Sequence, residues 1–164
     1  MRFSAPLRRL LTGVVCAIAL MGCRPEPVPP EAAVDAYARD GDTLSVTIGG
    51  VDEIVRLLGV DAPEQDACGA DEAKARLGEL THGRALTIVH DPYADERDRF
   101  GRILGYVEVD GVDVGLQMIT EGRAAAWWPR SEPEPERGRD YADAERTARG
   151  DAVGSWAMCE TMGR

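Results

Sequence analysis

Positive charge is scarce in this sequence of 164 residues. Its 19 lysines and arginines face 29 aspartates and glutamates, which gives a formal net charge of −10 at neutral pH. Proteins that grip duplex DNA through counterion release need many basic contacts, so this balance argues against strong duplex binding. A few local cations are enough to build a catalytic site for an anionic substrate, and the composition leaves that class open.

Cysteine and histidine are also few, and neither indicates a soft metal site. The two histidines lack metal-ligand spacing, and two sulfurs alone would need further ligands. Of the four cysteines, Cys16 and Cys23 lie near the N-terminus, which leaves Cys68 and Cys159. In an oxidising compartment such a pair is most simply a disulfide, and two free thiols are the alternative.

No apolar run is long enough to span a bilayer comfortably. The longest, from Leu10 to Met21, follows three arginines and is typical of an export signal. It leads into Met21-Gly22-Cys23, which resembles a bacterial lipobox. We therefore expect residues 1–22 to be a lipoprotein-type signal peptide and Cys23 to be lipidated. An ordinary signal peptide cut nearby, or a retained anchor, is the alternative.

Residues 23–34 contain four prolines and are expected to form an extended, solvated tether. Removal of residues 1–22 would delete three arginines and leave a net charge of about −13. The sequence thus predicts an exported cell-envelope lipoprotein anchored to a membrane, or a secreted protein if Cys23 is not lipidated.

A strong hairpin pattern follows the tether. Residues 43–48 alternate polar and apolar side chains, Gly49-Gly50 favours a turn, and residues 51–58 form a second β-branched run. Because the start of one hairpin strand lies beside the end of the next, we expect Asp42 and Asp61 to lie close together.

The rest of the chain predicts a first strand over residues 34–39, before the hairpin, and then two more strands and three helices. Helical spacing of apolar residues, capping residues and glycine stops place the helices, and β-rich runs place the strands. The expected order is three strands, a helix, two strands and two helices, which predicts an α+β fold with a five-stranded barrel and three packed helices. A single domain over residues 35–160 would accommodate these elements.

Three motifs in this order resemble the staphylococcal nuclease (thermonuclease) family. They are Asp40-Gly41-Asp42-Thr43, Arg56-Leu57-Leu58-Gly59-Val60-Asp61-Ala62-Pro63-Glu64 and Arg99-Phe100-Gly101-Arg102. Each fragment alone is weak, but all of them in order at these spacings are specific. The resemblance implies an OB-type barrel and a nuclease active site.

The resemblance also implies a role for each matching residue. Asp42, Asp61 and the backbone carbonyl of Ala62 would bind Ca²⁺, for which hard oxygen ligands are suited. Glu64 would be the general base that activates water, and two arginines would hold the phosphate: Arg56 and Arg102. Attack on phosphorus with loss of the 5′-oxygen would leave 3′-phosphate products.

Two aromatic positions depart from the family pattern. Phe100 stands where the family commonly has tyrosine, which removes a hydrogen bond to phosphate but keeps the ring. Trp128 falls near another tyrosine that touches the nucleotide, and its ring would stack on a base. Burial of Trp128 under the acidic, proline-rich loop that follows is the alternative.

The favoured function is therefore a Ca²⁺-dependent phosphodiesterase that hydrolyses DNA or RNA, acts preferentially and transiently on single strands, and works as a monomer. A non-catalytic nucleic-acid- or nucleotide-binding lipoprotein on the same barrel is the second hypothesis. A calcium-stabilised envelope protein with a structural role is the third. Non-catalytic binding modules, as in the second hypothesis, usually lose the acids or arginines, and this sequence keeps them.

Overall fold

The structure is a computed structural model that describes residues 29–160. The expected signal peptide, the lipidation site Cys23 and residues 23–28 of the expected tether lie outside the described residues. Five longer strands dominate the fold, and they are β1 (Glu31–Ala38), β2 (Thr43–Ile48), β3 (Val51–Leu57), β5 (Leu86–Val89) and β6 (Ile103–Val109).

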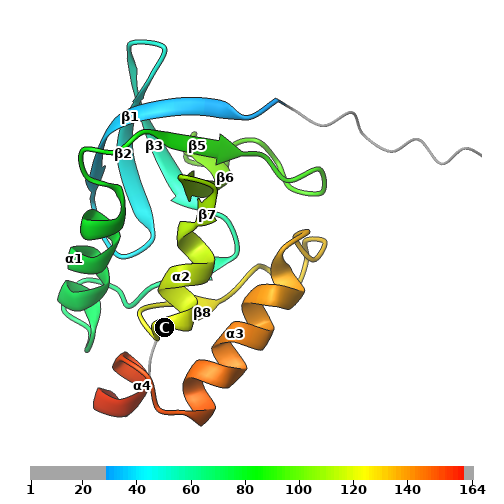
Figure 1. The fold of residues 1–164 in the computed structure, drawn as a ribbon. Coiled ribbons are helices and arrows are strands. Elements are labelled where there is room, and N and C mark those ends of the chain that lie inside the picture. The colour runs from blue at the N-terminus through cyan, green and yellow to red at the C-terminus, as the bar shows by residue number, and fades with distance from the viewer. Residues whose placement is uncertain (1–28, 161–164) are drawn as a thin grey trace, which may run out of the picture.

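These strands close into the predicted five-stranded barrel (Figure 1). Antiparallel neighbours follow the order β3-β2-β1-β5-β6, and parallel pairing of β3 with β6 closes the ring, with Val55 opposite Ile103. The β2–β3 hairpin has unbroken register from Thr43 opposite Arg56 to Ile48 opposite Val51. This register places Arg56 beside the residue that follows Asp42.

The turn of that hairpin is made by the predicted glycine pair. Gly49 and Gly50 have φ angles of 58° and 86°, which glycine adopts without steric cost. The turn fixes the hairpin register, and the register fixes which residues meet at the far end of the hairpin.

Three two-residue strands were not predicted: β4 (Val60–Asp61), β7 (Val112–Asp113) and β8 (Ala125–Ala126). Strands this short have no periodicity for sequence reasoning to detect. The pairing of β4 with β8 matters for the site, because it places Asp61 opposite Ala125. It also carries the following tryptophans to the barrel edge, where the Trp127 amide donates to the Gly59 carbonyl at 2.9 Å.

The three predicted helices are present as α1 (Ala70–Thr81), α2 (Val114–Thr120) and α3 (Gly138–Gly150). A further single turn, α4 (Ser155–Met158), was not predicted. Helix α2 packs against both α1 and α3, below the barrel in Figure 1. Among the described residues, no helix has both the length and the apolar character needed to cross a membrane.

Strand β1 begins at Glu31, although the tether was expected to run to residue 34. Glu31 lies opposite Ile88 of β5, and its carboxylate lies 2.8 Å from Nε2 of the buried His90 ring. The last residues of the proline-rich segment are therefore part of the sheet. Pairing with β5 explains this early start, and it is a tertiary contact that local composition does not reveal.

A buried polar network joins α2, α3 and the loop after β5 to the barrel. The Tyr141 hydroxyl donates to the Asp113 carboxylate at 2.9 Å, and Asp113 caps α2 by accepting from the Leu116 amide at 2.9 Å. The Tyr106 hydroxyl donates to Asp91, which is 6% exposed. Burial raises the pKa of both phenols, so they stay protonated donors.

The predicted disulfide between Cys68 and Cys159 is present, and it closes a sequence separation of 91 residues. It ties the loop between β4 and α1 to the residue that follows α4. Glu64 lies in this loop, so the cross-link restrains the segment that carries the predicted general base.

We predict that the double variant Cys68→Ser/Cys159→Ser is less stable than the wild type by roughly 2–4 kcal/mol, because the cross-link restricts the unfolded chain. Denaturant titration with and without reductant measures the difference. Reduced wild type should match the variant, and the variant should not respond to reductant. A wild-type midpoint that reductant leaves unchanged would contradict a stabilising disulfide.

Candidate active site

Two aspartates meet at one guanidinium nitrogen. Nη2 of Arg56 lies 3.0 Å from Oδ2 of Asp42 and 3.6 Å from Oδ1 of Asp61. Asp42 precedes β2, Arg56 is on β3 and Asp61 ends β4, so the hairpin brings the three together. The expectation that Asp42 and Asp61 lie close in space is confirmed.

Asp42 is the more deeply buried carboxylate, at 8% exposure for the whole residue. It accepts hydrogen bonds from the Ala62 amide at 2.9 Å and from the Thr43 hydroxyl at 3.0 Å. Burial nevertheless raises the pKa of Asp42 from its ordinary value to about 6, against the opposing influence of Arg56 and the Ala62 amide. A carboxylate under this desolvation penalty is stabilised by any further positive charge placed beside it.

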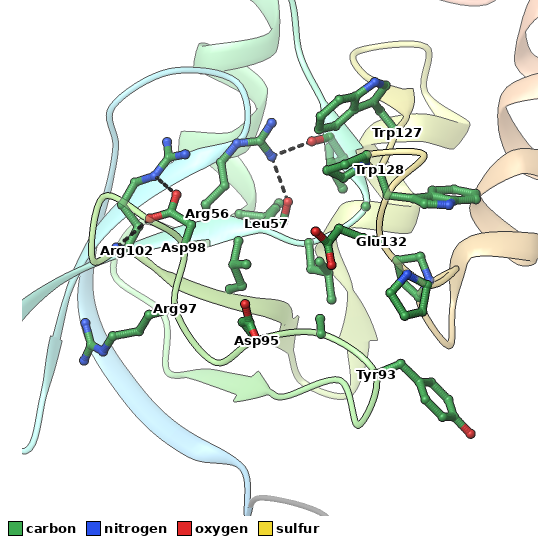
Figure 2. A pocket seen from close by; sticks show the side chains of 18 of the residues that line it. Arg56, Leu57, Tyr93, Asp95, Arg97, Asp98, Arg102, Trp127, Trp128 and Glu132 are labelled. Atoms are coloured by element: carbon green, nitrogen blue, oxygen red, sulfur yellow. Dashed lines mark hydrogen bonds and ion pairs between the residues drawn. The ribbon is translucent and has the colours of Figure 1, made fainter. Parts of the chain in front are cut away.

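Arg56 is occupied by neighbours from its own segment. Its Nη1 donates to the Leu57 carbonyl at 2.8 Å and also to the Val60 carbonyl, as the dashed lines in Figure 2 show. With the two carboxylates on Nη2, the guanidinium has acceptors on both terminal nitrogens. Arg56 thus holds the β3–β4 turn and the acid pair together, and contact with a phosphate requires it to exchange a partner.

Arg102 is positioned by Asp98. Its Nε donates to Oδ2 of Asp98 at 2.7 Å, while Oδ1 accepts from the backbone amides of Phe100 and Arg102 at 2.9 and 3.0 Å. Burial acts to raise the pKa of Asp98, but these bonds, with the Arg102 side chain foremost, hold it below its usual range. The terminal nitrogens of Arg102 remain available to an anion.

Arg56 and Arg102 line one cleft of about 570 Å³ (Figure 2). This volume lies within the range of small-molecule sites. Phe100 and Trp128, the two expected substrate-binding residues, line the same cleft. Four residues from three distant parts of the sequence therefore share one cavity.

The two aromatic residues differ in exposure. Phe100 is 68% exposed, with the guanidinium carbons of Arg99 and Arg102 at 4.7 and 5.5 Å from its ring centroid. Trp128 is half-buried, and a Cβ added at Gly138 would lie 3.2 Å from its ring. Trp128 thus lines the cleft and also packs against the start of α3, and stacking of its ring on a base stays a prediction.

The predicted metal ligands lie on the other side of Arg56, and they do not line the cleft. Asp42 and Asp61 supply hard oxygen atoms, which fit Ca²⁺ in chemical type. Ala62 is buried, and the hydrogen bond that its backbone amide donates to Asp42 places its backbone within the same site. Within residues 29–160, no group of three or more histidine, cysteine or acidic side chains gathers as a metal cluster, so further ligands would be this carbonyl and water.

Glu64, the predicted general base, is exposed and follows Ala62 by two residues. Its side chain has no hydrogen-bond or ion-pair partner among the described residues, and it does not line the cleft. The structure thus gathers the acids around Arg56, gathers Arg102 with the aromatics in the cleft, and leaves Glu64 on the adjoining loop.

Sequence reasoning missed several residues that line the cleft. These are the positioning residue Asp98 and the lining residues Tyr93, Asp95, Arg97, Trp127 and Glu132. A signal existed only for Asp98, whose i,i+4 spacing to Arg102 is a common ion-pair spacing. The others arrive from two loops that meet only through tertiary contacts.

Fold and site together define a class: an OB-type barrel with helices, whose hairpin carries an acid pair beside an arginine-lined cleft. A family described as "Staphylococcal nuclease homologue" matches residues 54–158. The chain belongs to this family. The match covers β3 through α4 and includes the two arginines and both loops of the cleft.

Similar proteins carry nuclease names. The chain is 33% identical over 126 residues to "Endonuclease YncB" of Bacillus subtilis, covering 73% of this chain and 59% of that protein. It is 32% identical to "SPbeta prophage-derived endonuclease YokF" of the same organism, covering 73% of this chain and 42% of that protein. It is 29% identical to "Micrococcal nuclease" of Shigella flexneri, covering 72% of this chain and 69% of that protein. The match thus spans about half the length of the two Bacillus subtilis proteins.

We predict that Arg56→Ala destabilises the calcium-free protein by about 2–3 kcal/mol at neutral pH, because it leaves the buried Asp42 carboxylate without its cation. In an Asp42→Asn background the same change should cost at least about 1 kcal/mol less, which measures the coupling of the pair. Chemical denaturation of the four proteins in this cycle supplies the numbers.

The matched control is Arg97→Ala. Arg97 pairs with Glu53 at 2.8 Å, but its side chain is 47% exposed, so we expect a loss below about 1 kcal/mol. Equal costs of Arg56→Ala in both backgrounds would mean that the Asp42 pair contributes nothing to stability.

Proposed function

We propose that the protein is a Ca²⁺-dependent nuclease that hydrolyses single-stranded DNA or RNA. The main support for this proposal is that Asp42 and Asp61 both contact Arg56, which also lines the cleft together with Arg102. A hard-cation site and a phosphate site are thereby adjacent, as hydrolysis of a phosphodiester needs. The nuclease names of the relatives support the same reading.

Each residue has a role in this proposal. Asp42, Asp61 and the Ala62 carbonyl would hold the ion, and Arg56 would keep the two carboxylates aligned. Ca²⁺, when bound, supplies a Lewis acid that polarises a phosphoryl oxygen and positions water. Arg102 would stabilise the charge that develops on the phosphoryl oxygens through its terminal nitrogens, which Asp98 leaves free.

Glu64 would accept the proton of the attacking water. It is exposed and unpaired among the described residues, so its carboxylate is open to a water molecule. Its loop is restrained at one end by the buried Ala62 and at the other by the disulfide at Cys68. Loss of the 5′-oxygen from phosphorus would leave 3′-phosphate products.

The preference for single strands rests on charge and size. The net charge of −10 gives little general attraction for a duplex. A cleft of about 570 Å³ has the size of a site for one nucleotide rather than for a base-paired helix. Stacking on Trp128 would add roughly 1–3 kcal/mol for an unpaired base. The protein would act as a monomer.

We predict that purified protein cleaves single-stranded DNA with Ca²⁺ and that excess chelator abolishes cleavage. Glu64→Gln should lower the rate by about 10²–10⁴-fold, because the amide cannot accept the proton. Arg102→Lys should lower it by about 10²–10³-fold, because the ammonium group loses the planar fork. Rates of oligonucleotide cleavage at saturating Ca²⁺ measure these losses.

The matched control is Glu72→Gln in α1, an exposed glutamate that lies outside the three motifs and does not line the cleft. It should keep the wild-type rate, and all three variants should melt within a few degrees of the wild type, because Glu64 and Glu72 are exposed and Arg102→Lys keeps the charge. Variants of Glu64 and Arg102 that cleave within threefold of wild type would show that other residues do the chemistry. A wild type that binds oligonucleotide but never cleaves would favour the binding module.

We further propose that the protein is an envelope lipoprotein attached through Cys23. The support is the sequence that ends in Met21-Gly22-Cys23, followed by prolines up to the start of β1 at Glu31. We predict that the full-length chain fractionates with membranes and that Cys23→Ser moves it to the soluble fraction, with loss of the lipid mass. Membrane association and intact mass that are identical in wild type and Cys23→Ser would contradict this attachment.

A further inference from the structure

Two carboxylates that the proposed mechanism does not use face into the cleft. Asp95 comes from the loop between β5 and β6, and Glu132 from the loop between β8 and α3. Figure 2 shows their oxygens directed toward the middle of the cleft from different walls, while Arg56 and Arg102 lie at another side. Neither carboxylate has a hydrogen-bond or ion-pair partner within residues 29–160.

The two walls that carry these acids are fixed to each other by Asp91. Oδ1 of Asp91 accepts from the Tyr93 amide at 2.7 Å, two residues before Asp95. Its Oδ2 accepts from the Glu136 amide at 2.6 Å and from the Tyr106 hydroxyl. One buried carboxylate thus holds both loops, so the spacing of the acids is set by the fold.

The Glu132 wall is further stiffened by its sequence. Pro129, Pro133 and Pro135 restrict its backbone, and the Glu132 amide donates to the Pro129 carbonyl at 3.0 Å in a turn. Little backbone entropy remains to be lost when a ligand contacts Glu132. The backbone that carries this acid is therefore in place before a ligand binds.

The chemistry of the cleft is thus divided. One side offers arginine donors suited to a phosphate, and the other offers only acceptors, because ionised carboxylates cannot donate. A second phosphate is repelled at the acid side. The part of a nucleotide that offers N–H donors is its base, and Trp127 and Trp128 supply aromatic surface for the ring in the same cleft.

We propose that Asp95 and Glu132 select the nucleobase and favour guanine. Guanine presents two adjacent N–H donors on its Watson–Crick edge, which match the two oxygens of one carboxylate. Adenine and cytosine present one amino group beside an acceptor, and thymine and uracil flank their single N–H with two carbonyls that repel a carboxylate. This inference rests on the proposed function, because it assumes that a nucleotide phosphate lies on the arginines.

The test measures binding of dGMP and dTMP, which contain no phosphodiester to cleave, in the presence of Ca²⁺. Two of the three tryptophans line the cleft, so intrinsic fluorescence reports occupancy. Wild type should bind dGMP at least about fivefold more tightly than dTMP. This ratio is at the low end of the discrimination that a bidentate contact provides, because both acids are exposed to solvent. Asp95→Asn and Glu132→Gln should each reduce this ratio.

Matched controls lie beside each acid. Glu96→Gln and Glu134→Gln remove the same charge from the same loops, but neither residue lines the cleft. Both controls should keep the wild-type ratio of dGMP to dTMP affinity. If the cleft variants strengthen binding of both nucleotides equally, the acids act only as a charge barrier, and base selection is wrong.

Cleavage separates this inference from the proposed function. Wild type that cleaves single strands but binds both nucleotides equally, or neither, would overturn base selection alone. Wild type that prefers dGMP but cleaves nothing would overturn the nuclease proposal and support the base site. Where both hold, product ends from random single strands should be enriched in guanine beside the cut, and Glu132→Gln should reduce this enrichment.

Discussion

A carboxylate placed where water cannot solvate it well is the constraint on which the site depends. Asp42 is almost fully buried at the end of the β2–β3 hairpin, and that burial raises its pKa to about 6. The ionised form therefore requires partners, and the fold supplies Arg56, the Thr43 hydroxyl and the Ala62 amide. Arg56 also contacts Asp61 and two backbone carbonyls. The arginine that balances the charge of Asp42 therefore also fixes the positions of Asp61 and of the β3–β4 turn.

The cleft depends on a second buried acid in the same way. Asp91 accepts from both cleft loops and from Tyr106, and Arg137 continues the network to Asp113 with a contact of 2.6 Å. In the low dielectric of the interior such bonds are strong when complete and costly when broken. Two loops without regular structure are thereby anchored to each other and to the barrel.

Features of the fold and the site could be predicted from the sequence where the residues in contact lie close together along the chain. The hairpin, the Asp113 cap and the meeting of Asp42 with Asp61 rest on contacts within about 20 residues, and local patterns predicted them. Strands β4 and β8 pair across more than 60 residues, and each has too few residues to show a period. The family motifs pointed to Arg56 and Arg102 of the cleft, but Asp95 and Glu132 belong to no motif and are brought together only by the cavity that they share.

The charge of the cleft bears on how an acidic protein would bind a polyanion under the proposed function. Arg56, Arg97 and Arg102 each form an ion pair with a carboxylate, and among the described residues Arg99 has no such partner. Because most of their charge is balanced, the arginines would orient a bound phosphate more than they would attract one from solution. Under the proposed function, a divalent cation at Asp42 and Asp61 would supply the missing positive charge and relieve Arg56 of balancing both acids. Substrate affinity would then follow occupancy of the metal site, and an acidic surface would carry little penalty.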